Sequence, residues 1–131
     1  MSENKQTKVP KSVSDWTRDT FDKAVRELIA NNLIDVEVIE ARPFWTMENT
    51  IVIGQVREAN EPTEFRWVIC GDLPTDHISS EVAATPQDVA RYFAMKWQLD
   101  AEKQSDSSES ARLTQKAEEL FELTEIEDIW Q

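Results

Sequence analysis

Apolar residues at helical spacing predict an amphipathic helix near the start of the chain. One stripe, at positions i, i+3, i+4 and i+7, contains Phe21, Ala24, Val25 and Leu28. Ser14 lies just before this stripe and is a candidate N-cap. The paired residues Asn31 and Asn32 follow it, and asparagine suits the left-handed position that ends many helices. We therefore expect a helix that begins near Ser14 and ends at Asn31 or Asn32.

Three stretches with the character of β-strands follow. Ile34, Val36 and Val38 alternate with polar neighbours, which predicts a strand with one wet face that ends at Pro43. Residues 50–57 and 64–70 are apolar on both faces and are separated by a polar turn. These two stretches predict an antiparallel hairpin in the middle of a sheet, with helices packed on each side.

Two further helices are expected in the second half of the chain. Thr85 followed by Pro86 is a strong helix start, and a broad apolar stripe follows it: Val89, Ala90, Phe93, Ala94, Trp97 and Ala101. A second stripe on the same helix, of Tyr92, Met95 and Leu99, predicts cover from another direction. Ser110 is the candidate N-cap of the last helix, whose stripe contains Leu113, Ala117, Leu120 and Phe121.

The order of these elements predicts an α+β fold, in which a small antiparallel sheet of about three strands, of undetermined order, packs with three helices. Residues 1–12 are polar and are expected to form a disordered N-terminal arm. Residues 13–123 are expected to form a single domain, and residues 124–131 an acidic and apolar C-terminal tail.

Composition narrows the classes of function. The net charge of −12 disfavours binding to phosphate backbones, so we expect no nucleic-acid partner; solubility is the preferred reason for the charge, over mimicry of nucleic acid. Two glycines cannot build a glycine-rich phosphate loop, and one cysteine cannot form an internal disulfide. The sequence contains no long apolar run and no signal-peptide pattern, so we expect a cytoplasmic protein without membrane contact.

Residues 70–77 bring the only cysteine and the only histidine close to two aspartates. Cys70 and His77 could act as a catalytic dyad, but Cys70 continues an apolar strand and is better interpreted as a buried side chain, so no catalytic residue is predicted. Asp72, Asp76 and His77 form the candidate polar site, and the same three residues could ligate a metal ion. The preferred interpretation is structural: Pro74 sets a turn, and the aspartates accept backbone hydrogen bonds.

Two other groups of residues are candidates for binding. An aromatic set could line a ligand pocket, although core packing is the preferred interpretation: Trp45, Phe65, Trp67, Tyr92, Phe93 and Trp97. Ile126, Ile129 and Trp130 stand in an acidic frame within the tail and could dock on a partner. The alternative, which we prefer, is that these three residues fold back onto this domain or onto a second copy.

The stretch W-V-I-C-G-D-L-P-T-D-H-I, followed by T-P-Q-D-V-A-R-Y-F-A-M-K-W, resembles an uncharacterised family of small bacterial proteins that share the motif W-V-I-x-G-D-L-P-T-D. The resemblance covers residues 65–97, about a quarter of the chain. It implies a shared fold and a bacterial origin, and it implies no activity. An aromatic residue often stands in that family where this chain has His77, which argues against a catalytic role for His77.

These observations lead to one main expectation and two alternatives. The main expectation is a non-enzymatic cytoplasmic protein that interacts with another protein or regulates it, with no cofactor and with a homodimer as one possible partnership. The first alternative is a metal-dependent enzyme or metal-binding protein centred on Asp72, Asp76 and His77. The second is a small-ligand binder that uses the aromatic set.

Overall fold

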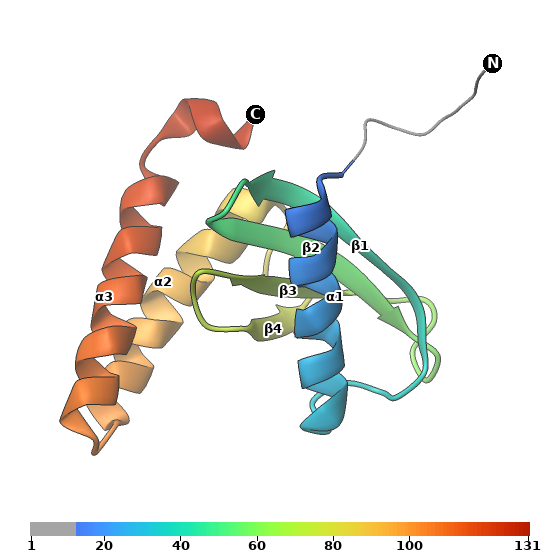
Figure 1. The fold of residues 1–131 in the computed structure, drawn as a ribbon, viewed down its shortest axis with the longest axis horizontal. Coiled ribbons are helices and arrows are strands. Elements are labelled where there is room, and N and C mark those ends of the chain that lie inside the picture. The colour runs from blue at the N-terminus through green and yellow to red at the C-terminus, as the bar shows by residue number, and fades with distance from the viewer. Residues whose placement is uncertain (1–12) are drawn as a thin grey trace.

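The structure, a computed structural model, describes residues 13–131, so the expected disordered arm lies outside the described residues. The fold is α+β, as the sequence predicted (Figure 1). In chain order the elements are α1 (Asp15–Ala30), β1 (Val38–Met47), β2 (Ile51–Glu58), β3 (Arg66–Gly71), β4 (Asp76–Ser79), α2 (Pro86–Lys103), α3 (Ser107–Thr124) and a short 3-10 helix, η1 (Glu127–Trp130).

Helix α1 has the boundaries that its sequence signals indicate. The Ser14 hydroxyl oxygen accepts a hydrogen bond from the Thr17 backbone N–H at 3.1 Å, which satisfies one of the free donors of the first turn. Asn32 follows the helix with a φ of 59°, the left-handed conformation that asparagine tolerates. Phe21 packs so closely on Gly54 of β2 that any side chain at position 54 would overlap its ring. Gly54 thus sets the close approach of α1 to the sheet.

The four strands form one antiparallel sheet in the order β1-β2-β3-β4. The predicted pairing of the two central strands is confirmed, with Ile53 opposite Ile69. The expected count of about three strands missed β4, whose register places Asp76 opposite Ile69 and Ile78 opposite Trp67. The four-residue strand Asp-His-Ile-Ser is too short to show an alternating pattern, and pairing with β3 defines it.

Strand β1 lies later in the chain than predicted. It begins at Val38, and it runs past Pro43 to pair with β2 up to Met47. A proline cannot donate a ladder hydrogen bond, but β1 is an edge strand, where that loss is tolerated. The register shifts between Pro43 and Trp45, next to the proline. Asn49, with a φ of 64°, makes the turn into β2.

The two C-terminal helices form an antiparallel pair joined by a short polar turn. Thr85 caps α2 as predicted, because its hydroxyl oxygen accepts from the Asp88 backbone N–H at 3.2 Å. The predicted cap of α3 is wrong: Asp106, not Ser110, accepts from the first backbone N–H groups of α3. The Ser110 hydroxyl instead donates to the Ala101 carbonyl at 2.8 Å, which ties α3 to the end of α2.

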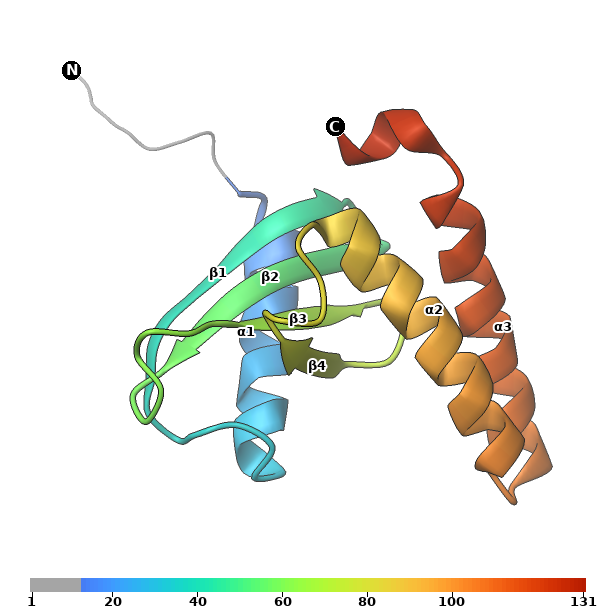
Figure 2. The ribbon, with the colours of Figure 1, turned by 180° about the vertical axis from the view of Figure 1, so that it is seen from behind.

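The sheet separates two hydrophobic cores, with α1 on one face and the α2–α3 pair on the other (Figures 1 and 2). Alternate residues of the central strands divide between the cores. The α1 side contains Phe21, Ala24, Val25, Leu28, Ile34, Val52, Val56, Val68 and Cys70. The larger core under α2 and α3 contains Ile51, Ile53, Trp67, Ile69, Ile78, Ala83, Val89, Ala90, Phe93, Ala94, Trp97, Ala117 and Leu120. Helices on both sides of the sheet were expected from strands that are apolar on both faces.

Among residues 13–131, the helices are too short or too polar for any of them to cross a lipid bilayer.

Candidate functional site

Asp76 joins β4 to α2 through a network of short hydrogen bonds. Its Oδ2 accepts from the Lys96 ammonium at 2.8 Å and from the Trp97 indole N–H at 3.1 Å, and its Oδ1 accepts from the backbone N–H of His77 at 2.9 Å. Burial acts to lower the pKa of Lys96, but hydrogen bonds to Asp76 and Asp100 outweigh it, so the pKa is raised. Asp76 therefore ties an edge strand to the core.

His77 points to the opposite face of the sheet, because successive side chains of a strand alternate. Its Nδ1 accepts a hydrogen bond from Nε of Arg66 at 3.1 Å, so the neutral ring carries its proton on Nε2. Burial lowers the pKa of His77, and the Arg66 guanidinium lowers it further, while Asp76 and Glu58 raise it and Lys96 lowers it. The histidine is thus held in its neutral form beside a cation.

The three residues of the candidate polar site do not share a centre. The Asp72 side chain is largely exposed and lies 3.6 Å from the ammonium of Lys116 on α3, whereas Asp76 is bonded to α2 and His77 to β3. In the part of the chain that the structure describes, no three His, Cys, Asp or Glu side chains are grouped so that they could hold a metal ion.

Cys70 and His77 also have separate partners. The Cys70 thiol is buried under α1, with its Sγ 3.9 Å from the Thr20 carbonyl oxygen. Burial raises the pKa of this thiol to about 12, with a further contribution from the Glu27 carboxylate. A thiol with so high a pKa is not a nucleophile near neutral pH, which fits the interpretation of Cys70 as a small buried side chain.

The turn between β3 and β4 is fixed in place by its backbone. Gly71 has a φ of 125°, a conformation open to glycine, and its Cα lies so close to the Thr50 carbonyl that a side chain would not fit. The Asp72 backbone N–H then donates to that same Thr50 carbonyl at 2.8 Å. Pro74 stiffens the rest of the turn. Together these features fix the backbone of residues 71–75, which lie between α1 and α3. We call these five residues the ledge.

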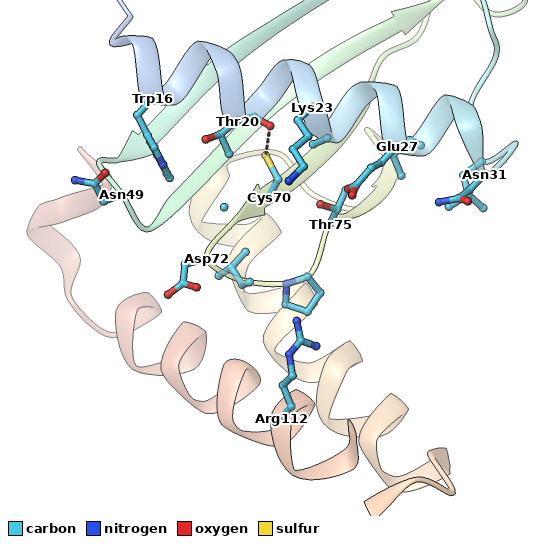
Figure 3. Close-up of a pocket in the computed structure, with 16 residues that line it drawn as sticks. Trp16, Thr20, Lys23, Glu27, Asn31, Asn49, Cys70, Asp72, Thr75 and Arg112 are labelled. Carbon is cyan, nitrogen blue, oxygen red and sulfur yellow. Dashed lines mark hydrogen bonds between the residues drawn. The ribbon is translucent and has the colours of Figure 1, made fainter. Parts of the chain in front are cut away.

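The ledge forms the floor of a cleft of about 730 Å³ between α1 and α3 (Figure 3). Lys23 and Glu27 project into it from α1, and Arg112 approaches it from α3 on the other side of the turn. The remaining lining residues are Trp16, Thr20, Ala24, Leu28, Asn31, Leu33, Asn49, Cys70, Gly71, Asp72, Leu73, Pro74 and Thr75. Clefts of this volume are the size that small ligands occupy in proteins.

Two basic side chains line the cleft, Lys23 of α1 and Arg112 of α3. Among residues 13–131, Arg112 is paired only with the exposed Glu109, one turn away on its own helix, at 3.5 Å. The ammonium of Lys116, one turn further along α3, lies 3.6 Å from the Asp72 carboxylate. Its positive charge partly offsets the negative potential of that carboxylate in the cleft. Within residues 13–131, Lys23 forms no ion pair. The cleft is thus less acidic than the surface of a chain with a net charge of −12.

Pattern analysis missed this site, although it singled out the turn that forms the floor. Lys23 and Arg112 lie on the exposed faces of helices 89 positions apart in the sequence, so spacing gave no sign that they face one cleft. The expected aromatic set lies elsewhere: Trp67, Phe93 and Trp97 are in the core. The aromatic side chain that lines the cleft is Trp16, which the helical stripe of α1 leaves out.

The C-terminal tail packs against its own domain. The Trp130 ring stacks on Trp45 of β1, with ring centroids 4.2 Å apart, and the Trp45 indole donates to the Ile129 carbonyl at 2.9 Å. The Trp130 indole in turn donates to the Leu123 carbonyl at 3.0 Å. Of the three tail residues proposed for docking, Ile129 and Trp130 are half-buried in these contacts and Ile126 is exposed.

The chain thus forms a small α+β protein. The turn from β3 to β4 lies between α1, on one face of the sheet, and α3, on the other, and it forms the floor of the cleft. Residues 11–130 match the family model described as domain of unknown function DUF4826, so the chain belongs to that family. No curated protein matches the chain, and no solved structure does.

Proposed function

We propose that this protein binds a small organic anion in the cleft between α1 and α3. The observation that carries the proposal is that Lys23 of α1 and Arg112 of α3 both line one ligand-sized cleft, on opposite sides of its floor, in an otherwise acidic chain. Each of these side chains could donate a hydrogen bond to an acceptor group of such an anion, and such charge-assisted bonds are the stronger kind. Trp16 and Leu73 supply apolar surface for the rest of the molecule.

We favour binding over catalysis because the cleft holds no activated nucleophile. The one thiol in its wall has a pKa raised to about 12 by burial, and His77 is held by Arg66 on β3. Nucleophilic catalysis requires a nucleophile within hydrogen-bond reach of a base. A cytoplasmic location belongs to the same proposal, and it is supported by a single cysteine that is free and buried.

Calorimetric titration with naphthylacetate, an aromatic carboxylate, tests the proposal. We expect saturable binding that weakens at least tenfold in Lys23→Ala and in Arg112→Ala, because each variant removes a charge-assisted hydrogen bond worth about 1.5–3 kcal/mol. Arg91→Ala is the matched control, because Arg91 is an equally exposed arginine in an i,i+3 pair with Asp88, outside the cleft.

The neutral naphthylacetamide separates charge from shape and should bind at least tenfold more weakly than the acid. Equal affinity for the acid and the amide would contradict the anion preference. No saturable binding of either compound, or an unchanged affinity in both cleft variants, would contradict the proposed site.

A further inference from the structure

One side of helix α2 faces away from both the sheet and α3 (Figure 2). The exposed large apolar side chains of α2 show that it has an uncovered apolar face. Its exposed side chains are Tyr92, Met95 and Leu99, with 38%, 64% and 51% of their surface accessible. The sequence predicted that a second element would cover this stripe, and within residues 13–131 the stripe is exposed. None of its residues lines the cleft, so the two surfaces are independent.

A charged residue follows the exposed stripe at each end, and the two residues have charges of opposite sign. Asp88, which also lies 3.6 Å from the Arg91 guanidinium, is in the first turn of α2, and Lys103 is in the last. At about 100° per residue, positions 88, 92, 95, 99 and 103 fall within an arc of about 80° of the helix surface. One face of α2 therefore carries, in order, an acid, three apolar side chains and a base. We call these five residues the α2 seam.

This order is complementary to itself when the helix is turned around. We propose that two copies of the chain pair through the α2 seam, antiparallel about a twofold axis that passes near Met95. Asp88 then faces Lys103 of the other copy at both ends, and Tyr92 faces Leu99. A parallel pair would place Asp88 against Asp88 and Lys103 against Lys103, so the charges select the antiparallel arrangement.

The charge of α2 favours this surface for self-association. The helix carries three acidic and three basic residues, so it is neutral within a chain of net charge −12. Two copies that approach through α2 meet less electrostatic repulsion than they would through the acidic region after it, where residues 104–131 carry two basic and eight acidic side chains.

Sedimentation equilibrium of the full chain tests the pairing. We expect a mass near twice 15.1 kDa at about 0.1 mM protein. Met95→Glu and Leu99→Glu should each raise the dissociation constant of the dimer at least tenfold, because they bury a carboxylate in the seam. Val36→Glu, which charges an equally exposed apolar position outside α2, should leave the constant unchanged. Circular dichroism checks that each variant is folded.

A charge exchange distinguishes this dimer from other associations. Asp88→Lys and Lys103→Asp should each weaken self-association when studied alone, because each places like charges opposite one another. A mixture of these two variants should form a heterodimer at least tenfold more stable than either homodimer, since every end pair is then an acid with a base. A monomeric wild-type chain, a dimer that survives both Met95→Glu and Leu99→Glu, or a mixture with no gain would overturn the proposal.

Discussion

Asp72 lies in the turn between β3 and β4, and Asp76 begins β4 four positions later. Of the two, Asp76 is the one that is joined to the core. Asp76 accepts from Lys96 and Trp97, both on α2. Asp72 lies on the surface, 3.6 Å from Lys116. A hydrogen bond that satisfies a buried donor is costly to remove, whereas an exposed ion pair contributes little. The two residues therefore have different weight in the stability of the fold.

Asp76→Ala should lower the free energy of unfolding by about 2 kcal/mol, because it leaves the buried Trp97 indole N–H without its acceptor. Asp72→Ala is the matched control and should change the free energy by less than about 0.5 kcal/mol. Urea unfolding, followed by tryptophan fluorescence, measures both. Equal effects of the two substitutions would mean that the network around Asp76 does not stabilise the fold.

His77 should make stability depend on pH between neutrality and mild acid. Its folded pKa is lowered by burial and by Arg66 relative to the ordinary value of 6.5. The unfolded chain therefore binds more protons in this window, and stability rises with pH. This contribution is present above pH 6.5 and is lost as the pH falls through the folded pKa.

Urea unfolding of the wild type at pH 7.5 and at pH 5.5 measures this contribution. The free energy of unfolding should fall more on acidification in the wild type than in His77→Gln, which cannot be protonated in this range. A wild type that becomes more stable at pH 5.5, or an equal fall in both proteins, would contradict the neutral, Arg66-bonded state of His77.

Cys70 should react slowly with thiol reagents in the folded protein. Its side chain is buried, and burial raises its pKa to about 12. Labelling with an aromatic disulfide at pH 8 should become at least a hundredfold faster when urea unfolds the chain. A labelling rate equal to that of the unfolded chain would show that the cleft wall opens around Cys70.

At the scale of elements, the C-terminal tail, residues 124–131, packs across the end of the larger core. We call this segment the strap. Trp130 stacks on Trp45, and the Gln87 side-chain amide donates to the Thr124 carbonyl at 2.9 Å where the strap leaves α3. Trp130→Ala should lower the free energy of unfolding by about 2 kcal/mol, because it removes buried ring area and an aromatic pair. Ile126→Ala, at an exposed position, should have little effect.

Thermal unfolding measured by circular dichroism tests the role of the strap. A Trp130→Ala protein that melts at the wild-type temperature would contradict the packed tail. It would instead support the interpretation in which Ile126, Ile129 and Trp130 are free to bind a partner.

The sequence predicted those elements whose limits depend on neighbouring residues. Ser14 and Thr85 are the N-caps of α1 and α2. The hydroxyl oxygen of each accepts a hydrogen bond from the backbone N–H three positions along the chain. Strand β4, in contrast, exists because it pairs with β3. The passage of β1 through Pro43 depends on its place at the sheet edge. Neither the pairing of β4 nor the edge position of β1 can be predicted from the spacing of residues close together in the sequence.

The same distinction explains the candidate site. Asp72, Asp76 and His77 are neighbours in sequence, but strand alternation and helix contacts separate their side chains. Lys23 and Arg112 are distant in sequence, but α1 and α3 bring them to one cleft. The turn from Gly71 to Thr75 lies within residues 70–77, the stretch that the sequence analysis considered as a candidate site. Its role is to form the floor of the cleft and not to supply a cluster of ligands.

At the scale of the whole molecule, the proposed binding and the proposed self-association use separate surfaces. The cleft lies between α1 and α3, and the α2 seam contributes no residue to it. Met95→Glu should therefore abolish the dimer without changing the affinity of the cleft for naphthylacetate, which calorimetry on the monomeric variant can measure. A loss of ligand affinity in parallel with the loss of the dimer would show that the two surfaces are coupled.

The most direct test of the account is to map the bound anion by NMR on uniformly ¹⁵N-labelled protein. Titration with naphthylacetate should shift the backbone amide signals of residues that line the cleft, including Thr20, Asp72 and Thr75, and should leave those of Tyr92 and Leu99 in place. Shifts centred on α2, or the absence of any saturable shift, would contradict the claim that the cleft between α1 and α3 is the functional site.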